Sequence, residues 1–169
     1  MPSSLPRLAL SRGGVRGEVD ARHLTAMRPV LGKAPLVRDG WIFELKLDGF
    51  RAVADVRRSA VVLRYRSGHD CTPTFPEIAS ALGRLRISRV VLDGELVAFD
   101  DRGRPDFDRM RARMHPTRAA KPAVSYHVFD VLAVGDVDLR QAPLVARKQI
   151  LARIIAGSNG ALREVPYVA

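Results

Sequence analysis

Apolar and polar residues alternate along residues 41–47, which form the clearest strand pattern in the chain. The apolar positions share one face, while Glu44 and Lys46 occupy the other. This pattern predicts a half-buried strand with a polar working face. The Asp-Gly pair that follows is typical of a tight turn, and the apolar positions of 51–56 predict a second strand after it.

The rest of the chain mixes short strands with helices. Runs of β-branched and apolar residues predict further strands at 61–65, 89–99, 124–132 and 162–168. Apolar residues at helical spacing predict helices after a capping box at 74–77, at 107–114 and at 143–157. Because strands outnumber helices and short turns join them, the pattern favours an α+β fold, with antiparallel sheets and flanking helices, over a βαβ design.

Residues 1–22 lack this periodicity. They are rich in serine, proline and glycine, which predicts a flexible leader, with the folded domain beginning at about His23. Their glycines do not form a phosphate-binding loop, because the Gly-x-x-x-x-Gly-Lys-Ser/Thr pattern is absent from the sequence.

The composition fits a globular domain. A length of 169 residues and a hydrophobic fraction of 47% are enough for one domain with a substantial core. The single cysteine, Cys71, rules out an internal disulfide and a cysteine-based zinc site. No apolar run approaches the roughly 20 residues that a membrane span needs, and the N-terminus lacks the apolar block of a signal peptide. These features favour a cytoplasmic protein with no membrane partner.

The chain is strongly basic. Its formal net charge of +10 comes from 28 lysines and arginines against 18 aspartates and glutamates. Such a charge favours an anionic partner, such as nucleic acid or a nucleotide. An arginine-rich composition inherited from a GC-rich genome explains the same charge, and composition alone does not separate the two explanations.

The strongest chemical signal is the run from Lys46 to Arg51, which has the form Lys-x-Asp-Gly-x-Arg. Lys46 would project from a strand end beside a turn, where Gly49 lets the backbone approach a ligand closely. Arg51 would return on the next strand with a guanidinium suited to phosphate or ribose. A lysine beside other cations loses its proton more easily and becomes a nucleophile. An ordinary hairpin with an exposed lysine and arginine is the competing interpretation.

Three more segments carry candidate chemistry. Asp93 and Glu95 stand two residues apart on one strand face, where a carboxylate could hold a ribose hydroxyl or Mg²⁺. The pair Asp93-Gly94 also fits a solvated hairpin that would break the strand. Phe129 could stack on a base or belong to the core. Arg66 follows a strand and could contact phosphate or ribose.

Taken together, five blocks of the sequence resemble the adenylation domain of ATP-dependent DNA ligases, most closely those of bacterial end-joining repair. The blocks lie at 44–51, 66–70, 75–78, 92–95 and 128–132. Their order and spacing are more specific than any one motif, and the resemblance runs from about residue 24 to 169. It implies a nucleotidyltransferase fold similar to the ATP-grasp type, ATP and Mg²⁺ as cofactors, and nicked double-stranded DNA as partner.

The resemblance also implies a mechanism. Lys46 would match the nucleophile that attacks the α-phosphate of ATP, releases pyrophosphate and forms lysyl-AMP. AMP would then pass to the 5′-phosphate of a nick, and the 3′-hydroxyl would displace it. Asp48, Gly49, Asp93 and Gly94 would match the residues that support these motifs.

Five residues would match the nucleotide-binding positions of the family. Glu44 would bind the adenine amino group, and Phe129 would stack on the adenine ring. Arg51 and Arg66 would contact ribose and phosphate. Glu95 would bind the ribose and the metal ion.

The sequence departs from the family after the block at 128–132. The family's later Glu-Gly-lysine motif, its strand with two more lysines and its OB-fold domain are not found in these 169 residues. We therefore expect residues 23–169 to be the N-terminal portion of an adenylation domain, with impaired activity unless a second polypeptide supplies the rest. One open alternative is a non-catalytic ligase remnant or a basic nucleic-acid-binding fragment. Another is an RNA ligase or a capping-type nucleotidyltransferase, which the blocks at 66–70 and 75–78 disfavour.

Overall fold

The computed structural model describes residues 4–33, 39–58, 60–114, 121–158 and 160–169. Its helices are α1 (Ser4–Ser11), α2 (Pro76–Gly83), α3 (Phe107–Arg113) and α4 (Leu144–Ile155), with 3₁₀ turns η1 (Ala21–His23) and η2 (Thr72–Thr74). The longer strands are β3 (Phe50–Arg57), β4 (Ala60–Tyr65), β5 (Arg89–Ala98) and β6 (Val124–Val134). The shorter strands are β1 (Val15–Arg16), β2 (Phe43–Glu44), β7 (Val137–Asp138), β8 (Leu162–Glu164) and β9 (Tyr167–Val168).

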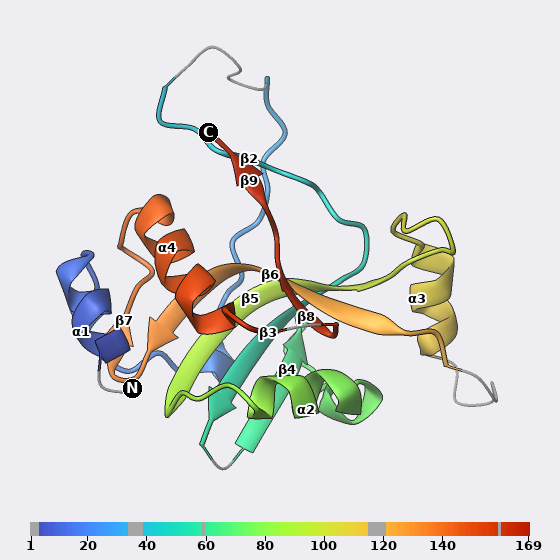
Figure 1. The fold of residues 1–169 in the computed structure, drawn as a ribbon, viewed down its shortest axis with the longest axis horizontal. Helices are drawn as coiled ribbons and strands as arrows, with labels where there is room; N and C mark the ends of the chain where they lie inside the picture. The colour runs from blue at the N-terminus through green and yellow to red at the C-terminus, as the bar shows by residue number, and fades with distance from the viewer. Residues whose placement is uncertain (1–3, 34–38, 59, 115–120, 159) are drawn as a thin grey trace.

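Most strands of the described residues belong to one seven-stranded sheet, which we call the main sheet. Its order is β1-β7-β6-β5-β3-β4, and β8 pairs with β6 in parallel. The other neighbours in the main sheet are antiparallel. The strands β2 and β9 form a separate antiparallel pair that stands apart from the main sheet, beside the C-terminus (Figure 1). The predicted α+β class, with antiparallel sheets and flanking helices, is confirmed.

The core lies where α1, α2 and α4 cover one face of the main sheet (Figure 1). Strand β5 is buried along nearly its whole length, because both of its faces are covered. Tyr126 of β6 is fully buried, and its hydroxyl donates a hydrogen bond to the Ala52 carbonyl at 2.8 Å. The opposite face of the sheet carries a smaller apolar cluster that includes Val53 and Val91.

The N-terminal segment differs from the flexible leader predicted for residues 1–22. Helix α1 buries Ala9 in the core, and β1 pairs with β7. Gly14 lies so close to the Ala9 carbonyl and Val137 that an added Cβ would stand 2.8 and 2.6 Å from them. Val19 then joins the apolar cluster on the opposite face. Local periodicity could not indicate this packing, because β7 and α4, which pack with β1 and α1, lie more than a hundred residues away in the sequence.

Neither Asp-Gly pair forms the turn that the sequence predicts. Strand β2 covers only two residues of the strand predicted at 41–47, and it pairs with β9 and not with β3. Gly49 instead lets the chain pass β5, since a Cβ there would lie 2.1 Å from the Leu96 carbonyl oxygen. Strand β5 continues through Asp93 and Gly94 with a register shift against β6 at that point. A Cβ on Gly94 would lie 2.6 Å from the His127 carbonyl oxygen.

The capping box predicted at 74–77 is wrong, although the helix behind it exists. Helix α2 begins after Phe75 without a side-chain cap. Glu77 pairs with Arg113 of α3, at 2.8 Å between carboxylate oxygen and guanidinium nitrogen. The Arg113 guanidinium is buried, and it also donates to the Thr74 carbonyl at 3.0 Å.

Candidate functional site

A small pocket opens where the segment from β2 to β3 meets the main sheet. Its volume is about 140 Å³, and it is lined by Glu44, Leu45, Lys46, Leu47, Glu95, Phe129 and Val165. These residues come from β2, the loop after it, β5, β6 and the segment between β8 and β9. Four residues for which the sequence predicts nucleotide chemistry, Glu44, Lys46, Glu95 and Phe129, therefore lie around one pocket.

Lys46 is exposed in the loop between β2 and β3. The close approach of Gly49 to β5 brings this loop against Glu95. Burial raises the pKa of Glu95 to about 6, against the opposing effects of the Gly49 backbone N–H and of the charges on Arg51 and Lys46. The site thus combines an accessible lysine with a partly buried carboxyl group.

Arg51 and Asp93 form a bidentate ion pair next to Phe129, one of the residues that line this pocket. The Arg51 guanidinium donates to the two carboxylate oxygens of Asp93 at 3.0 and 2.7 Å, and it also donates to the Met27 carbonyl. Burial raises the pKa of Asp93, and its hydrogen bond with Arg51 opposes that change. The guanidinium carbon of Arg51 lies 5.3 Å from the ring centroid of Phe129, within cation–π range. Asp93, expected to support a motif, is therefore the direct partner of Arg51.

Arg66 stands near these residues but does not line the pocket. Its side chain is exposed after the end of β4. Its backbone N–H donates to the Arg51 carbonyl at 3.2 Å, which places the two arginines at the same part of the sheet. The contact with a nucleotide that the sequence predicts for Arg51 and Arg66 remains a prediction.

The sequence analysis missed Lys148, which lies in α4 directly behind the pocket. Its side chain is fully buried, and its ammonium donates to the Glu44 carboxylate and to the Phe129 carbonyl. A signal was present, because Leu144, Lys148 and Leu151 share one face at helical spacing. A lysine within an apolar face needs a buried partner, but helical spacing does not indicate which residue that is.

The donor set fits a metal ion held mainly by a substrate. The part of the chain that the structure describes contains no group of three or more His, Cys, Asp or Glu residues that could hold a metal. Mg²⁺ in nucleotide sites takes one or two carboxylates and completes its shell with phosphates and water. Glu95 fits that role, whereas both carboxylate oxygens of Asp93 are already bonded to Arg51.

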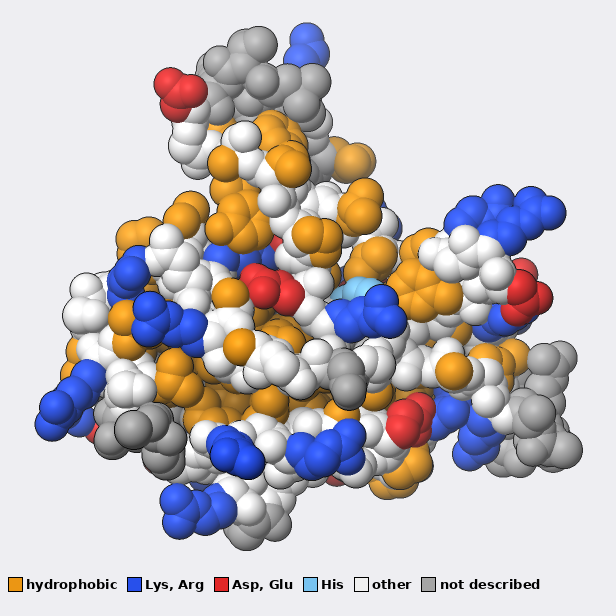
Figure 2. Space-filling view, viewed as in Figure 1, with side chains coloured by type: hydrophobic (Ala, Val, Ile, Leu, Met, Phe, Trp, Pro, Cys, Tyr) orange, Lys and Arg blue, Asp and Glu red, His pale blue; other side chains and the backbone are white. Residues whose placement is uncertain are grey.

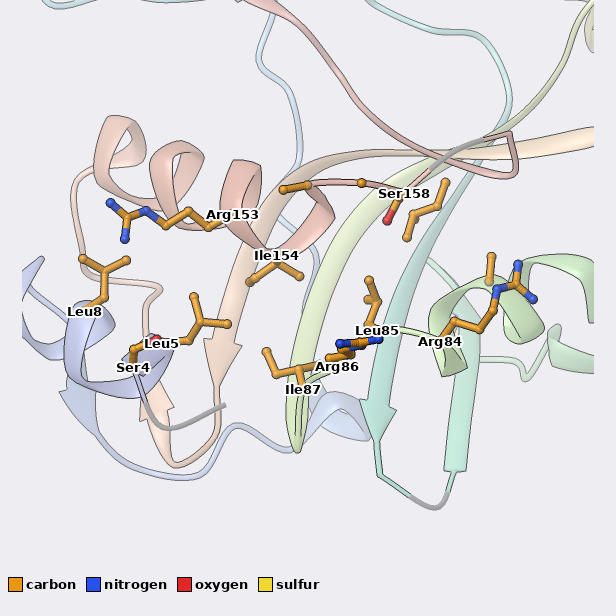
Figure 3. A pocket seen from close by; sticks show the side chains of 14 residues that line it. Ser4, Leu5, Leu8, Arg84, Leu85, Arg86, Ile87, Arg153, Ile154 and Ser158 are labelled. Atoms are coloured by element: carbon orange, nitrogen blue, oxygen red, sulfur yellow. The ribbon is translucent and has the colours of Figure 1, made fainter. Parts of the chain in front are cut away.

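A larger cavity lies elsewhere, between α1, the α2–β5 connection and the end of α4 (Figure 3). Its volume is about 540 Å³, and its described lining includes Arg84, Arg86 and Arg153 with no acidic residue. Figure 2 shows lysine and arginine side chains at the rim of this face and apolar side chains between them. The cavity contains none of the predicted site residues, so we assign the candidate site to the smaller pocket on its chemistry.

No helix within the described ranges is both long enough and apolar enough to cross a membrane.

Comparison with known proteins identifies the family to which the chain belongs. Residues 26–167 match the family described as ATP dependent DNA ligase domain. Because the match covers most of the chain, the protein belongs to this family of ATP-dependent DNA ligase domains. The fold agrees, since the chain superposes on the crystal structure of the ligase domain from M. tuberculosis LigD with a TM-score of 0.74 and 28% identity.

Two curated relatives show which members of the family this chain resembles in sequence. The multifunctional non-homologous end joining protein LigD of Pseudomonas aeruginosa is 37% identical over 122 residues, which are 72% of this chain and 14% of that protein. DNA ligase C1 of Mycolicibacterium smegmatis is 34% identical over 142 residues, with 76% of this chain and 41% of that protein covered.

A second solved structure, of mycobacterial DNA ligase D complexed with ATP and MES, has a TM-score of 0.67 and 26% identity. Both solved structures cover 89% of this chain, and this chain covers 48% of each of them. The chain therefore spans about half of a solved ligase domain and a smaller part of the curated relatives.

Proposed function

We propose that this chain is the nucleotide-binding part of an ATP-dependent DNA ligase that acts in end-joining repair, with Lys46 as its nucleophile. The observation that carries the proposal is the single pocket that joins Lys46 to Glu44, Glu95 and Phe129. Family membership and the ATP complex of a structural relative support the choice of ATP.

In this proposal the neutral amine of Lys46 attacks the α-phosphate of ATP. A nitrogen–phosphorus bond forms, the bond to the bridging oxygen breaks, and pyrophosphate leaves with its electron pair. The ammonium must first give up a proton, and Lys46 is accessible enough to pass it to water. AMP then remains on Lys46 until a DNA 5′-phosphate accepts it.

The pocket walls would select and hold the nucleotide. Phe129 would stack on the adenine ring, while Glu44 would accept a hydrogen bond from its amino group. Arg51 would keep the Phe129 ring in place, since its guanidinium is committed to Asp93. Glu95 would hold the ribose and a Mg²⁺ ion, and that ion would offset the negative charge of the triphosphate.

The proposed partner is nicked or broken double-stranded DNA. The net charge of +10 would favour its phosphates, and the name of the Pseudomonas aeruginosa relative includes non-homologous end joining. A second polypeptide is a further proposed partner, and the chain by itself spans about half of a solved ligase domain. We expect the reaction to take place in the cytoplasm, where bacterial DNA lies.

Incubation of the purified chain with radiolabelled ATP and Mg²⁺ tests the proposal. We expect label that survives denaturation, that is absent from Lys46→Ala, and that persists in Lys121→Ala, which removes an exposed lysine outside the pocket. Equal labelling of Lys46→Ala, or a folded wild-type chain without label, would contradict a catalytic role.

Two competing functions predict different results in this labelling experiment and in matched assays of DNA binding, acceptor and donor. A non-catalytic remnant that binds nucleic acid would show salt-dependent DNA affinity, unchanged by Lys46→Ala, and no covalent AMP. An RNA ligase or capping-type enzyme would prefer nicked RNA as acceptor or GTP as donor.

A further inference from the structure

Lys148 is a buried cation outside the residues to which the proposed function assigns a role. Its ammonium has three neighbours, which are the Glu44 carboxylate, the Phe129 carbonyl and, at 5.8 Å from the ring centroid, Tyr167. Glu164 is also close enough to interact, because burial raises its pKa with help from the charge of Glu44 and against that of Lys148. Lys148 is therefore a buried cation whose charge acts on both Glu44 and Glu164.

The ion pair between Lys148 and Glu44 occupies only one of the two carboxylate oxygens of Glu44. Oε1 accepts from Lys148, whereas Oε2 has no hydrogen bond to any residue that the structure describes. Glu44 lines the pocket and its side chain is 26% exposed, so we infer that Oε2 is the oxygen that a ligand in the pocket would meet. A carboxylate oxygen accepts hydrogen bonds and cannot donate them. A ligand edge that meets Glu44 must therefore present a donor.

The same ammonium also links Glu44 to the ring beside it. Glu44 belongs to β2, which has only a two-residue pairing with β9, while Phe129 belongs to the long strand β6. Lys148 binds the side chain of the first and the backbone of the second. One buried residue thus sets the position of a polar group against an aromatic ring, the two features needed to recognise a flat base.

We propose that Lys148 is a positioning residue that sets the base specificity of the pocket, favouring a purine with an amino group over one with an oxo group at the same position. An adenine amino group donates to the free oxygen of Glu44, whereas the oxo group of hypoxanthine brings two acceptors together. The inference rests on the proposed function, because it concerns the same pocket. It goes beyond that function by naming the residue that fixes which base is accepted.

Calorimetric titration with ATP and with inosine triphosphate, without Mg²⁺ so that binding is measured apart from transfer of AMP to Lys46, tests the inference on three chains. The wild type should bind ATP more tightly than inosine triphosphate. Lys148→Met keeps an unbranched side chain of similar length, and it should reduce that preference by about tenfold, the value of one hydrogen bond of about 1.4 kcal/mol. The ratio of the two dissociation constants is the readout, because a loss of stability alone lowers both affinities together.

Arg147→Met is the matched control, since Arg147 is the neighbouring cation on α4 and makes its own buried ion pair with Asp130 at 2.7 Å. It should keep the wild-type ratio. An unchanged ratio in Lys148→Met would overturn the inference and leave the proposed function standing. Absence of binding by the wild type to either nucleotide would overturn both.

A double variant covers the case in which Lys148→Met does not fold. Glu44→Gln together with Lys148→Met removes both charges of the ion pair, so neither is left unpaired. The amide of the new glutamine can donate or accept a hydrogen bond. The preference for ATP over inosine triphosphate should therefore disappear. Retention of the wild-type preference by this double variant would also overturn the inference.

Discussion

The main sheet and the β2–β9 pair differ in how they are held. The long strands β3, β5 and β6 pair over many residues, and their apolar side chains are buried by helices. Strands β2 and β9 share a two-residue pairing, and Leu45 beside them is 70% exposed. Yet β2 and its loop supply Glu44 and Lys46 to the pocket. The main sheet therefore supplies the stability together with Glu95 and Phe129, whereas the proposed nucleophile lies on the weakly held segment, and the contacts of Lys148 join the two.

The largest expected effect is on the free energy of unfolding, when a leucine is truncated to alanine in the main sheet and, for comparison, beside β2. Leu92→Ala in β5 should lower the free energy of unfolding by about 2–5 kcal/mol, because Leu92 is fully buried. Leu45→Ala should change it by less than about 0.5 kcal/mol, since that side chain is largely exposed. Urea denaturation of both variants measures the difference. Equal losses would show that the β2 segment is as firmly packed as the sheet.

A smaller effect is expected where the two regions touch. Gly49→Ala should cost about 1–3 kcal/mol, because its Cβ would lie 2.1 Å from the backbone oxygen of Leu96. It should also abolish labelling by ATP, since the loop that carries Lys46 must move. Gly17→Ala is the control, as a Cβ at Gly17 has no described atom within 4 Å. Thermal unfolding and labelling of both variants check this, and a stable, active Gly49→Ala would refute the close approach.

The smallest expected effect is a pH dependence at Glu95. The folded state raises the pKa of Glu95 from the ordinary value of 4.5 to about 6. Folding therefore favours the protonated carboxyl group, and this contribution is lost as the pH rises from about 4.5 to 6. Over that interval Glu95→Gln should become more stable relative to the wild type, by less than about 1 kcal/mol because the side chain is partly exposed.

Unfolding of both chains at several pH values measures the Glu95 effect. Taking the difference between the two chains removes the opposite contribution of His127, whose pKa burial lowers to about 4. A difference that is constant with pH would contradict the buried state of Glu95.

Sequence patterns predicted the parts of the molecule whose cause is local. The apolar runs at 51–56, 61–65 and 124–132 correspond to β3, β4 and β6, and the predicted helices correspond to α2, α3 and α4. The ordered motifs also predicted four residues that line the pocket, because each motif carries its own chemical signature.

The remainder depends on contacts between distant residues. The partner of Lys148 is Glu44, 104 residues away, and the helical pattern does not identify it. The pattern at 41–47 predicts a half-buried strand of seven residues, but β2 covers only two of them and Leu45 is 70% exposed. Its pairing with β9, near the other end of the chain, has no local signal. An Asp-Gly pair predicts a turn, but the same dipeptide also occurs where a strand must pass close to another backbone, as Gly49 and Gly94 do here.

The central claim is that the pocket at β2 presents one reactive lysine to a nucleotide. Peptide mapping by mass spectrometry after incubation with ATP and Mg²⁺ tests it most directly, because the four lysines Lys33, Lys46, Lys121 and Lys148 fall at separate places in the sequence. We predict that AMP is found on the peptide that contains Lys46 and on no other. AMP on a different lysine, or on none in a folded sample, would contradict the account.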